Sequence, residues 1–354
     1  MTAAFEPVRW AVAGWGAGGR VFHAPMIAAA DGLDLVAVVS TNPDRAREAR
    51  SAGLEALPDL SSLRDAGIEG VTITTPAGTH ADLAVEALDL GLHVVVDKPF
   101  ATTAEDARRI VAAASPGTVL TVYQNRRWDG DFLTIQGLVE SGELGRVDRL
   151  ESRIERFRPD LPRWTRDRDS VHGGGVLVDL GPHLIDQAVH LLGPARQVFA
   201  DLTILGDDRL SEDDAVVMLR HASGSRSTIV ASVHAAAEGP RFRVSGTRGG
   251  LRIEGFDPQE ADLFAGRTPT SLGDRWGSDD PARTARWEGD GPSRRALARG
   301  RWDTFYPSVA AAVRTRTPPP VPASDAVHVA EIFDAARRSA AEGCWIDVAA
   351  PVSN

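Results

Sequence analysis

The chain opens with a short apolar run that ends in three closely spaced glycines. Residues 8–13 indicate a buried strand, and Gly14, Gly16 and Gly19 follow at once, before a helical stretch over residues 20–30. Glycines at this spacing allow a tight turn and let the backbone approach a pyrophosphate, whose charge the helix N-terminus meets. The pattern is weak by itself and also fits a turn without a ligand. Between a strand and a helix, it predicts an α/β unit that binds a dinucleotide.

Strand and helix patterns alternate through the rest of the first third of the chain. Strands are predicted at residues 33–39, 70–74, 92–96 and 118–123, and helices at 42–52, 79–90 and 103–114. Such alternation is typical of a doubly wound parallel sheet with right-handed crossover connections.

The pattern changes after residue 122. Helices are predicted at 131–141 and 175–192, and strand-like runs at 146–157, 197–205, 214–220, 226–235, 241–246 and 249–254. Short turns between consecutive strands imply an antiparallel or mixed sheet. Residues 257–301 are rich in Gly, Pro and Arg, so we expect an irregular excursion that Trp276 and Trp287 pack down. Helices at 302–315 and 324–342 close the chain.

Composition excludes several classes of protein. The 354 residues favour two domains, and 43% hydrophobic and 25% charged residues are ordinary for a soluble globular protein. No apolar stretch approaches the length of about 20 residues that spans a bilayer. A net charge of −10 argues against a nucleic-acid partner. Residues 1–8 do not resemble a signal peptide, and the single Cys344 fits a reducing environment, so a cytoplasmic location is expected.

Lys98 is the only lysine among 39 lysine and arginine residues. It follows the apolar run 92–96, within Asp97-Lys98-Pro99. Ligands of open parallel sheets bind beyond the carboxyl ends of the strands, so we expect Lys98 at the lip of the cofactor crevice. A surface lysine in a turn is the alternative. Arginine cannot lower its pKa usefully, whereas lysine can, which makes a lone lysine a candidate for chemistry.

The end of the second predicted strand bears on the choice of cofactor. Ser40, Thr41 and Asn42 stand where an acidic residue would accept hydrogen bonds from the ribose of NAD, and Arg45 and Arg47 follow. Hydroxyl and guanidinium groups suit a 2′-phosphate, so NADP is favoured and NAD stays an alternative. The arginines can also be a solvated helix face.

A second group of residues follows the strand at 70–74. Thr74, Thr75 and Pro76 lie at its end and are expected to line the dinucleotide, together with His80. His80 can equally be a structural or capping histidine.

A polar stripe lies within the predicted helix 175–192. On an unbroken helix, one face would carry Asp179, His183, Asp186 and His190. Pro182 means that the helix either bends there or begins near Gly181. The stripe can simply face water. A zinc site that uses His172 is less favoured, because the chain has no HExxH pattern, and no Gly-x-Ser-x-Gly elbow supports a serine hydrolase.

Alcohol oxidation would suit these side chains. A base must take the hydroxyl proton while hydride leaves the same carbon for a nicotinamide. His183 has a suitable intrinsic pKa, Asp179 is expected to orient its ring, and Lys98 is expected to hydrogen-bond the reacting oxygen. Whether Lys98 or His183 accepts the proton stays open.

Over essentially its whole length, the chain resembles the Gfo/Idh/MocA family of oxidoreductases. The shared marks are the glycine run 14–19, the Asp97-Lys98-Pro99 tripeptide and the placement of Asp179 four residues before His183. Narrower marks at residues 19–25, 125–129 and 179–187 resemble the NADP-dependent scyllo-inositol dehydrogenase branch.

The resemblance implies a fold, a cofactor and a substrate class. The expected fold is an N-terminal Rossmann domain over residues 1–122 and a C-terminal α/β domain over 123–354, whose large open, mostly antiparallel sheet mediates homodimer or homotetramer contacts. A nicotinamide dinucleotide and a cyclic polyol or sugar, inositol first, would bind, and the catalytic residues would be Lys98, Asp179 and His183. Asp97 stands where the family usually has glutamate, which puts its contact with the nicotinamide ribose in question. No metal is expected.

Two residue sets follow from the motifs and the resemblance together. The predicted cofactor site comprises Gly14, Gly16, Ala17, Gly18, Gly19, Ser40, Thr41, Arg45, Thr74, Thr75, Pro76, His80, Asp97, Lys98 and Asn125. The predicted substrate site comprises Lys98, Asn125, Arg126, Trp128, Trp164, Asp179 and His183, with Asp129 and Arg156 as further polar clamps. Core packing is the alternative for each of the two tryptophans.

Two alternative functions stay open. A dinucleotide-binding sensor without catalysis would keep the fold, although the intact Lys98, Asp179 and His183 argue against it. A reductase of another small carbonyl or an imine would keep the chemistry and change the substrate.

Overall fold

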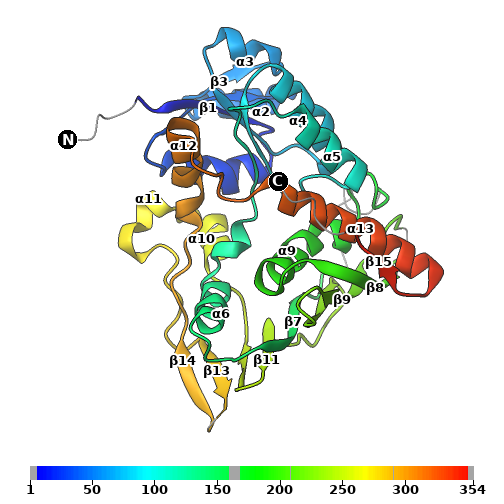
Figure 1. The fold of residues 1–354 in the computed structure, drawn as a ribbon. Helices are drawn as coiled ribbons and strands as arrows, with labels where there is room; N and C mark the ends of the chain where they lie inside the picture. The colour runs from blue at the N-terminus through cyan, green and yellow to red at the C-terminus, as the bar shows by residue number, and fades with distance from the viewer. Residues whose placement is uncertain (1–5, 159–167, 208, 290, 350–354) are drawn as a thin grey trace.

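The computed structural model describes residues 6–158, 168–207, 209–289 and 291–349. Trp164, which was predicted to line the substrate pocket, lies outside the described residues. The chain forms an upper half around one sheet and a lower half around another (Figure 1).

A six-stranded parallel sheet forms the upper half, in the order β3-β2-β1-β4-β5-β6. Its strands are β1 Val8–Ala13, β2 Leu33–Val39, β3 Glu55–Leu57, β4 Gly70–Ile73, β5 His93–Val96 and β6 Leu120–Val122. The doubly wound prediction is confirmed. The strand order reverses between β1 and β4, and this switch point is where open α/β sheets bind ligands.

Helices connect these strands, and local sequence explains where they begin. They are a π-helix Gly18–His23, α1 Ala24–Ala28, α2 Pro43–Ser51, α3 Ser61–Asp65, α4 His80–Asp89 and α5 Ala104–Ala113. Asn42 caps α2 by accepting a hydrogen bond of 2.9 Å from the backbone N–H of Asp44. Thr103 caps α5 in the same way, at 3.2 Å from the N–H of Asp106. The stretch predicted as one helix over 20–30 is a π turn followed by a short α-helix.

A nine-stranded sheet forms the lower half, in the order β14-β13-β12-β11-β7-β10-β9-β8-β15. Its first strands along the chain are β7 Val147–Glu155, β8 Ala195–Thr203, β9 Asp214–His221, β10 Arg226–Ser232, β11 Phe242–Gly246 and β12 Gly250–Ile253, and β15 Ile346–Asp347 closes one edge. β7 and β10 pair in parallel, and the other neighbours are antiparallel, so the mostly antiparallel prediction is confirmed.

Four helices of the described residues contribute to the apolar core of this sheet. They are α6 Gly130–Glu140, α8 Val176–Asp179, α9 Gly181–Leu192 and α13 Ala323–Glu342. Inward side chains alternate along the strands, as in β9, where Ala215, Val217 and Leu219 are buried. The outward side chains of the same strand, such as Val216 and Met218, are not part of this core, so among the described residues the helices gather on the other face of the sheet.

The prediction of an irregular excursion over residues 257–301 is wrong. This segment contains α10 Gln259–Phe264, α11 Pro269–Leu272, β13 Thr284–Glu288 and β14 Ser293–Ala296. The two strands extend the sheet at one edge, where only one face is covered and the outward positions are charged. Such short strands carry too few apolar residues to be seen in the sequence. Trp276 and Trp287 are buried, as expected.

Helix α12 Phe305–Thr315 returns to the upper half, where Figure 1 shows it near β1. Phe305, Tyr306 and Val309 are fully buried and belong to the same apolar cluster as β1 and β5. The C-terminal part of the chain therefore completes the core of the upper half. The division at residues 122 and 123 stays a prediction.

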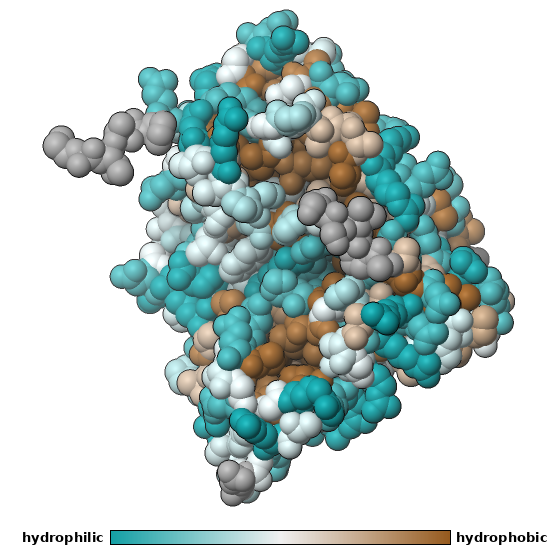
Figure 2. Space-filling view, viewed as in Figure 1, coloured by the Kyte–Doolittle hydropathy of each residue, from teal (hydrophilic) through white to brown (hydrophobic). Residues whose placement is uncertain are grey.

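Figure 2 shows apolar side chains gathered in two areas of this face, one on each half, with mostly hydrophilic side chains between them. This matches two separate apolar clusters, one for each sheet. Within the described ranges, no helix is long and apolar enough to cross a membrane.

The upper core supplies a test of its packing. A Cβ on Gly70 of β4 would overlap the indole ring of Trp10, which is fully buried. We expect Gly70→Ala to lower the free energy of unfolding by about 1–3 kcal/mol, because an overfilled core must distort. Urea unfolding measures the change.

The matched control is Gly137→Ala, on the exposed side of α6 with open space around the new methyl group. There the same change should stabilise the protein by about 0.5–1 kcal/mol through helix propensity. Equal effects at the two positions would contradict this account of the core.

Candidate active site

The turn after β1 has the shape that a pyrophosphate requires. Gly14 has φ +101°, and a Cβ there would lie 2.9 Å from the carbonyl oxygen of Thr74. Gly16 has no atom within 4 Å of a Cβ position, so its outer side is open. A Cβ on Gly19 would overlap the carbonyl oxygen of Gly14. The three glycines thus serve a tight turn, an open approach for phosphate, and close packing of helix on strand, so these residues fit a dinucleotide.

Two guanidinium groups meet near the end of β2. Arg45 donates to Glu48 at 2.8 Å, and Arg20 donates to the same carboxylate oxygen at 2.9 Å. The hydrogen bond from Arg45 is the largest cause of the lowered pKa of Glu48, and Arg20 adds to it. Ser40 accepts a hydrogen bond of 3.3 Å from the backbone N–H of Asn42, the residue that caps α2. The Ser40 hydroxyl therefore lies at the start of α2.

Sequence reasoning missed Arg20, although it directly follows the last glycine of the turn. Its contact with Glu48 appears only in the fold, where the helical turn after Gly19 brings Arg20 to α2. Arg47 differs from Arg45, because it pairs with Asp44 on the surface of α2. For Arg47 the alternative of a solvated helix face is therefore the better description.

His80 lies beneath the predicted cofactor surface. The ring is 2% exposed, and its two nitrogens lie 2.8 Å from the carbonyl oxygen of Pro99 and 2.7 Å from that of Thr75. Burial is the main cause of its lowered pKa. A neutral ring has one N–H and donates it to one of these oxygens, while its other nitrogen faces the second, so the buried ring lies between the loops after β4 and β5. The structural alternative for His80 is the one that this geometry favours.

Thr74 and Asp97 border the glycine turn itself. A Cβ on Gly18 would lie 3.2 Å from the hydroxyl of Thr74 and 3.3 Å from Oδ2 of Asp97. Asp97 Oδ1 also accepts a hydrogen bond of 2.7 Å from the backbone N–H of Lys98. The ends of β1, β4 and β5 therefore meet at one edge of the sheet, as the parallel topology predicted.

The ammonium group of Lys98 reaches across to the lower half. Its Nζ donates to the backbone oxygen of Asp179 at 2.9 Å and to Oδ1 of the same residue at 3.0 Å. The two residues are 81 positions apart in the chain. The side chain of Lys98 is 23% exposed and that of Asp179 is 43% exposed, so the pair lies at an opening and not in a sealed core.

The predicted polar stripe does not lie on one helix. Helix α8 Val176–Asp179 ends at Leu180, and α9 begins at Gly181 with Pro182 in its first turn, as one of the two predicted alternatives had it. His183 is buried and His190 is exposed. Because the helix is broken between Asp179 and His183, Asp179 turns to Lys98 and does not orient the ring of His183.

Glu212 holds the short helix α8 in place. Its side chain accepts a hydrogen bond of 3.0 Å from the N–H of Leu177, and its backbone oxygen accepts one of 3.0 Å from Val176. Gly175 has φ +85°, and a Cβ there would overlap the carboxylate of Glu212. Burial raises the pKa of Glu212. This contact explains the glycine before α8. The sequence could not reveal it, because Glu212 is 35 residues from Leu177 along the chain.

His183 is a buried imidazole surrounded by cations. The residue is 6% exposed, and its Nδ1 is buried with no hydrogen-bond partner among the described residues. Burial lowers its pKa well below the ordinary value, and the positive charges of Lys98, Arg126, Arg241 and Arg156 lower it further. The ring is therefore neutral near pH 7 and able to accept a proton.

Two of the sequence marks are partners of one another. Arg127 donates to both carboxylate oxygens of Asp186 at 2.7 and 2.6 Å, and Gln187 donates to the backbone oxygen of Arg126 at 2.7 Å. These bonds fix the 3₁₀ segment Asn125–Trp128 against α9, the helix that carries His183.

Most of the other residues predicted to bind substrate in this segment are buried and already contact other side chains. Asn125 and Arg126 are 5% exposed, and Arg126 pairs with Asp129 and Glu260. Asp129 is fully buried and accepts a hydrogen bond from Trp302 at 2.8 Å, so it is not open to a substrate. Trp128 packs edge-on against Phe305 with ring centroids 5.8 Å apart. For Trp128 the packing alternative is the one that this contact supports.

The zinc alternative finds no support in the described part of the chain. No group of three His, Cys, Asp or Glu residues there could hold a metal ion. His172 is exposed and pairs with Asp169 at 2.7 Å, while His183 is buried elsewhere.

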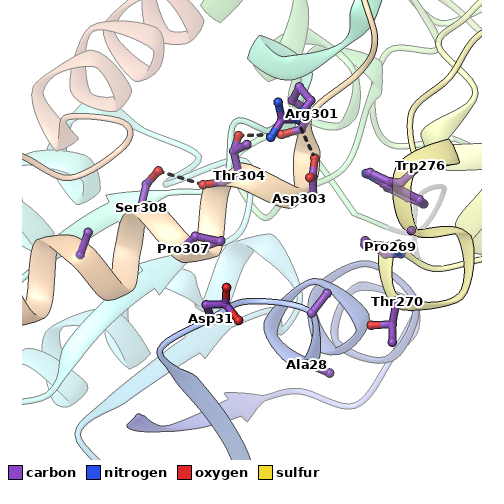
Figure 3. Close-up of a pocket in the computed structure, with 13 residues that line it drawn as sticks. Ala28, Asp31, Pro269, Thr270, Trp276, Arg301, Asp303, Thr304, Pro307 and Ser308 are labelled. Atoms are coloured by element: carbon purple, nitrogen blue, oxygen red, sulfur yellow. Dashed lines mark hydrogen bonds and ion pairs between the residues drawn. The ribbon is translucent and has the colours of Figure 1, made fainter. Parts of the chain in front are cut away.

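A separate cavity of about 820 Å³ lies between α1, α11 and α12 (Figure 3). Its walls include the carboxylates of Asp31 and Asp303, and none of the residues that line it belongs to the predicted cofactor or substrate sets. The hydroxyls of Thr304 and Ser308 already donate to the backbone of their own turn. We assign no role in the chemistry to this cavity.

Two family models match most of the chain. "Oxidoreductase family, NAD-binding Rossmann fold" matches residues 8–124, and "GFO/IDH/MocA C-terminal domain" matches residues 132–252. The chain is 38% identical over 345 residues to the oxidoreductase YdgJ of Escherichia coli, with 95% of this chain and 97% of that one covered.

Two further comparisons agree. The chain is 30% identical over 344 residues to scyllo-inositol 2-dehydrogenase (NADP(+)) IolW of Bacillus subtilis, with 95% of each covered. Among solved structures, that of the oxidoreductase yvaA from Bacillus subtilis superposes with a TM-score of 0.89 at 29% identity and covers 97% of this chain and 99% of that one.

The lowered pKa of His183 has a consequence for stability. As pH falls below about 6.5, the unfolded chain binds a proton on this histidine while the folded protein does not, so the folded state loses stability. We expect His183→Gln to remove this loss, by up to about 1.4 kcal/mol per pH unit below 6.5. Urea unfolding of both proteins at pH 7.5 and pH 5.5 measures it.

His172→Gln, at an exposed position, is the control for replacing a histidine by glutamine. A difference between wild type and His183→Gln that stays constant from pH 7.5 to 5.5 would contradict the buried neutral imidazole.

Proposed function

Because the chain belongs to the Gfo/Idh/MocA family of NAD(P)-binding oxidoreductases, we propose that it is an NADP-dependent dehydrogenase that interconverts a secondary alcohol of a cyclic polyol or sugar with its ketone. The observation that carries the proposal is the reach of the Lys98 ammonium to Asp179, beside the neutral His183. In this proposal, the ammonium group of Lys98 from the upper half and the imidazole of His183 from the lower half act on one substrate.

Each of these side chains has a defined task. A nicotinamide dinucleotide held at the glycine turn would supply the hydride acceptor for the alcohol carbon, or the hydride donor for the ketone. Lys98 has three N–H donors, of which two are used on Asp179, so the third is free to hydrogen-bond the reacting oxygen and stabilise its negative charge. Asp179 fixes the direction of that ammonium group.

His183 is the proposed proton acceptor. Its Nδ1 is sealed from solvent, so Nε2 is the nitrogen left to take the hydroxyl proton. Burial and the surrounding cations keep the ring neutral at physiological pH, so it offers a lone pair to the hydroxyl proton, although the same surroundings make it a weak base.

The preference for NADP rests on Arg20 and Arg45. These two guanidinium groups share the carboxylate of Glu48 on α2. Helix α2 begins just after Ser40 and Thr41. A 2′-phosphate carries more charge than a carboxylate and offers three oxygens, so it would compete for the same donors. The relative IolW, whose name states NADP(+), supports this choice.

The substrate class rests on the polar rim and on the relatives. Glu260 accepts hydrogen bonds from both Arg126 and Arg156, the latter at 3.3 Å. Arg156 and Glu260 are partly exposed and can bind hydroxyl groups of one ring, whereas Arg126 is buried and holds Glu260 in place. The name of IolW, scyllo-inositol 2-dehydrogenase, makes inositol the first substrate to test.

We also propose that the open face of the nine-stranded sheet joins copies of the chain. Phe199 lies opposite Met218, and Val216 lies opposite Val230, on the side away from the helices. These apolar neighbours would lose water contact in a homodimer or homotetramer. A cytoplasmic location and the absence of nucleic-acid and membrane partners stay predictions.

The first test removes the ammonium group. Lys98→Met should lower kcat by about 100-fold or more, the effect of losing one donor to a developing oxyanion, while the dissociation constant for NADPH changes little. Steady-state rates with NADP across a panel of inositols and sugars, with NADPH fluorescence for binding, measure both.

Lys98→Arg is the control that keeps the charge. Activity of Lys98→Met within about tenfold of wild type, a loss of only about 1.4 kcal/mol of barrier stabilisation, would show that the proposed role is wrong. Binding of NADPH by wild type without turnover on any member of the panel would favour a non-catalytic sensor.

The second test separates the two cofactors. Arg20→Ala and Arg45→Ala should each raise KM for NADP by about tenfold and leave KM for NAD nearly unchanged, because only NADP carries the 2′-phosphate. Arg47→Ala is the matched control, since it removes the same group from a residue that pairs with Asp44. Faster turnover of wild type with NADH than with NADPH would contradict this assignment.

A further inference from the structure

A chain of buried polar groups leads from Asp97 into the core of the nucleotide half. Oδ2 of Asp97 lies 3.4 Å from Nε2 of His23, and Nδ1 of His23 lies 2.7 Å from the hydroxyl of Tyr306. That hydroxyl lies 2.9 Å from the hydroxyl of Thr72, which accepts a hydrogen bond of 2.8 Å from the indole N–H of Trp10. The last four residues are fully buried.

The two ends of this chain fix its direction. The indole of Trp10 can only donate, and an ionised carboxylate at Asp97 can only accept. Nε2 of His23 faces Oδ2 of Asp97 at 3.4 Å and is buried with no closer hydrogen-bond partner among the described residues. In the tautomer that carries its hydrogen on Nε2, this N–H points toward the carboxylate and Nδ1 is left as an acceptor. Tyr306 then donates to Nδ1, and Thr72 donates to Tyr306. Each of the two hydroxyls then donates once, to the neighbouring group on the side of Asp97.

Distant segments assemble this series. Trp10 and Thr72 lie on β1 and β4, His23 ends the π-helix Gly18–His23, and Tyr306 lies in the first turn of α12. The wider π turn follows directly on the glycine cradle, and π turns often occur at functional sites. The return of α12 to the upper half therefore supplies a polar group as well as apolar contacts.

The carboxylate at the end of the series is held on both oxygens. Oδ1 of Asp97 accepts from the backbone of Lys98, and Oδ2 faces His23 and the Gly18 turn. Burial raises the pKa of Asp97, but the contact with His23 and the positive charge of Lys98 lower it by more, so the net shift is downward and the carboxylate stays ionised.

We propose that His23 is a positioning residue for Asp97, and that Tyr306, Thr72 and Trp10 hold its imidazole in the Nε2–H tautomer. The device aims the carboxylate at the cofactor beside the catalytic lysine. It rests on the proposed function in one respect, because it takes Asp97 as a contact of the nicotinamide ribose.

Removal of one hydroxyl should break the device. In Tyr306→Phe, Nδ1 of His23 loses its donor, and the imidazole can take the Nδ1–H tautomer. Nε2 would then present a lone pair to Asp97, and the carboxylate would lose a directed donor. Thr72→Val removes the next donor in the series and should act in the same direction to a smaller extent.

Tyr123→Phe is the matched control. The ring of Tyr123 lies 4.4 Å from that of His23 and 5.9 Å from that of Tyr306, so it belongs to the same buried aromatic group. Its hydroxyl is buried and has no partner among the described residues. The same atom is thus removed from the same environment without cutting the series.

The test combines two readouts. Nitrogen-15 NMR of cofactor-free protein reports the tautomer of His23, and fluorescence titration reports the dissociation constant for NADPH. We expect Nε2–H in wild type and Tyr123→Phe, and Nδ1–H in Tyr306→Phe. The dissociation constant should rise by about tenfold in Tyr306→Phe, as for a lost charge-assisted hydrogen bond, and by less than about twofold in Tyr123→Phe, with kcat nearly unchanged in both.

Several results would overturn the proposal. They are an Nδ1–H tautomer in wild type, or a Tyr306→Phe protein that matches Tyr123→Phe in both readouts. Thr72→Val decides the question if Tyr306→Phe does not fold. A wild-type protein that binds NADH but not NADPH would refute only the cofactor preference, and the same titrations would then use NADH. Binding of neither cofactor would refute the proposed function and the positioning role together.

Discussion

The chemistry depends on one contact between the two halves of the molecule, the ammonium group of Lys98 on Asp179. A lysine with two of its three donors committed to one residue has a fixed direction, and its third donor can point at a substrate oxygen. The same positive charge helps to keep the nearby His183 neutral. In the proposed reaction, one cation would both stabilise charge on the substrate and keep the imidazole neutral, which an unattached lysine on a surface loop could not do.

That contact is held by structure on both sides. On the upper side, the buried ring of His80 lies between the loops after β4 and β5 and donates to a backbone oxygen of one of them. On the lower side, Glu212 caps the short helix that ends in Asp179, and Arg127 fixes α9 through Asp186. These buried groups hydrogen-bond in pairs, as they must where water is excluded. The halves are therefore not independent bodies joined by a linker, since α12 also completes the core of the first.

Much of this arrangement could be predicted from the sequence, because it follows from local patterns. The glycine turn, the strand before Lys98 and the break at Pro182 each depend on neighbouring residues. The contacts that were missed depend on distant ones. Arg20 meets Glu48, Glu212 meets Leu177, and Tyr306 meets His23, and no local pattern reports such pairs. Strands β13 and β14 were missed for another reason, since edge strands with charged outward positions carry little apolar signal.

The central claim is that Lys98 and His183 act on the same substrate oxygen. A crystal structure of the wild-type protein with NADP and a bound, non-reacting inositol analogue tests it most directly. The account predicts one hydroxyl oxygen within hydrogen-bond distance of both the side chain at position 98 and Nε2 of His183, with its carbon against the nicotinamide. A polyol bound out of reach of either side chain would contradict it.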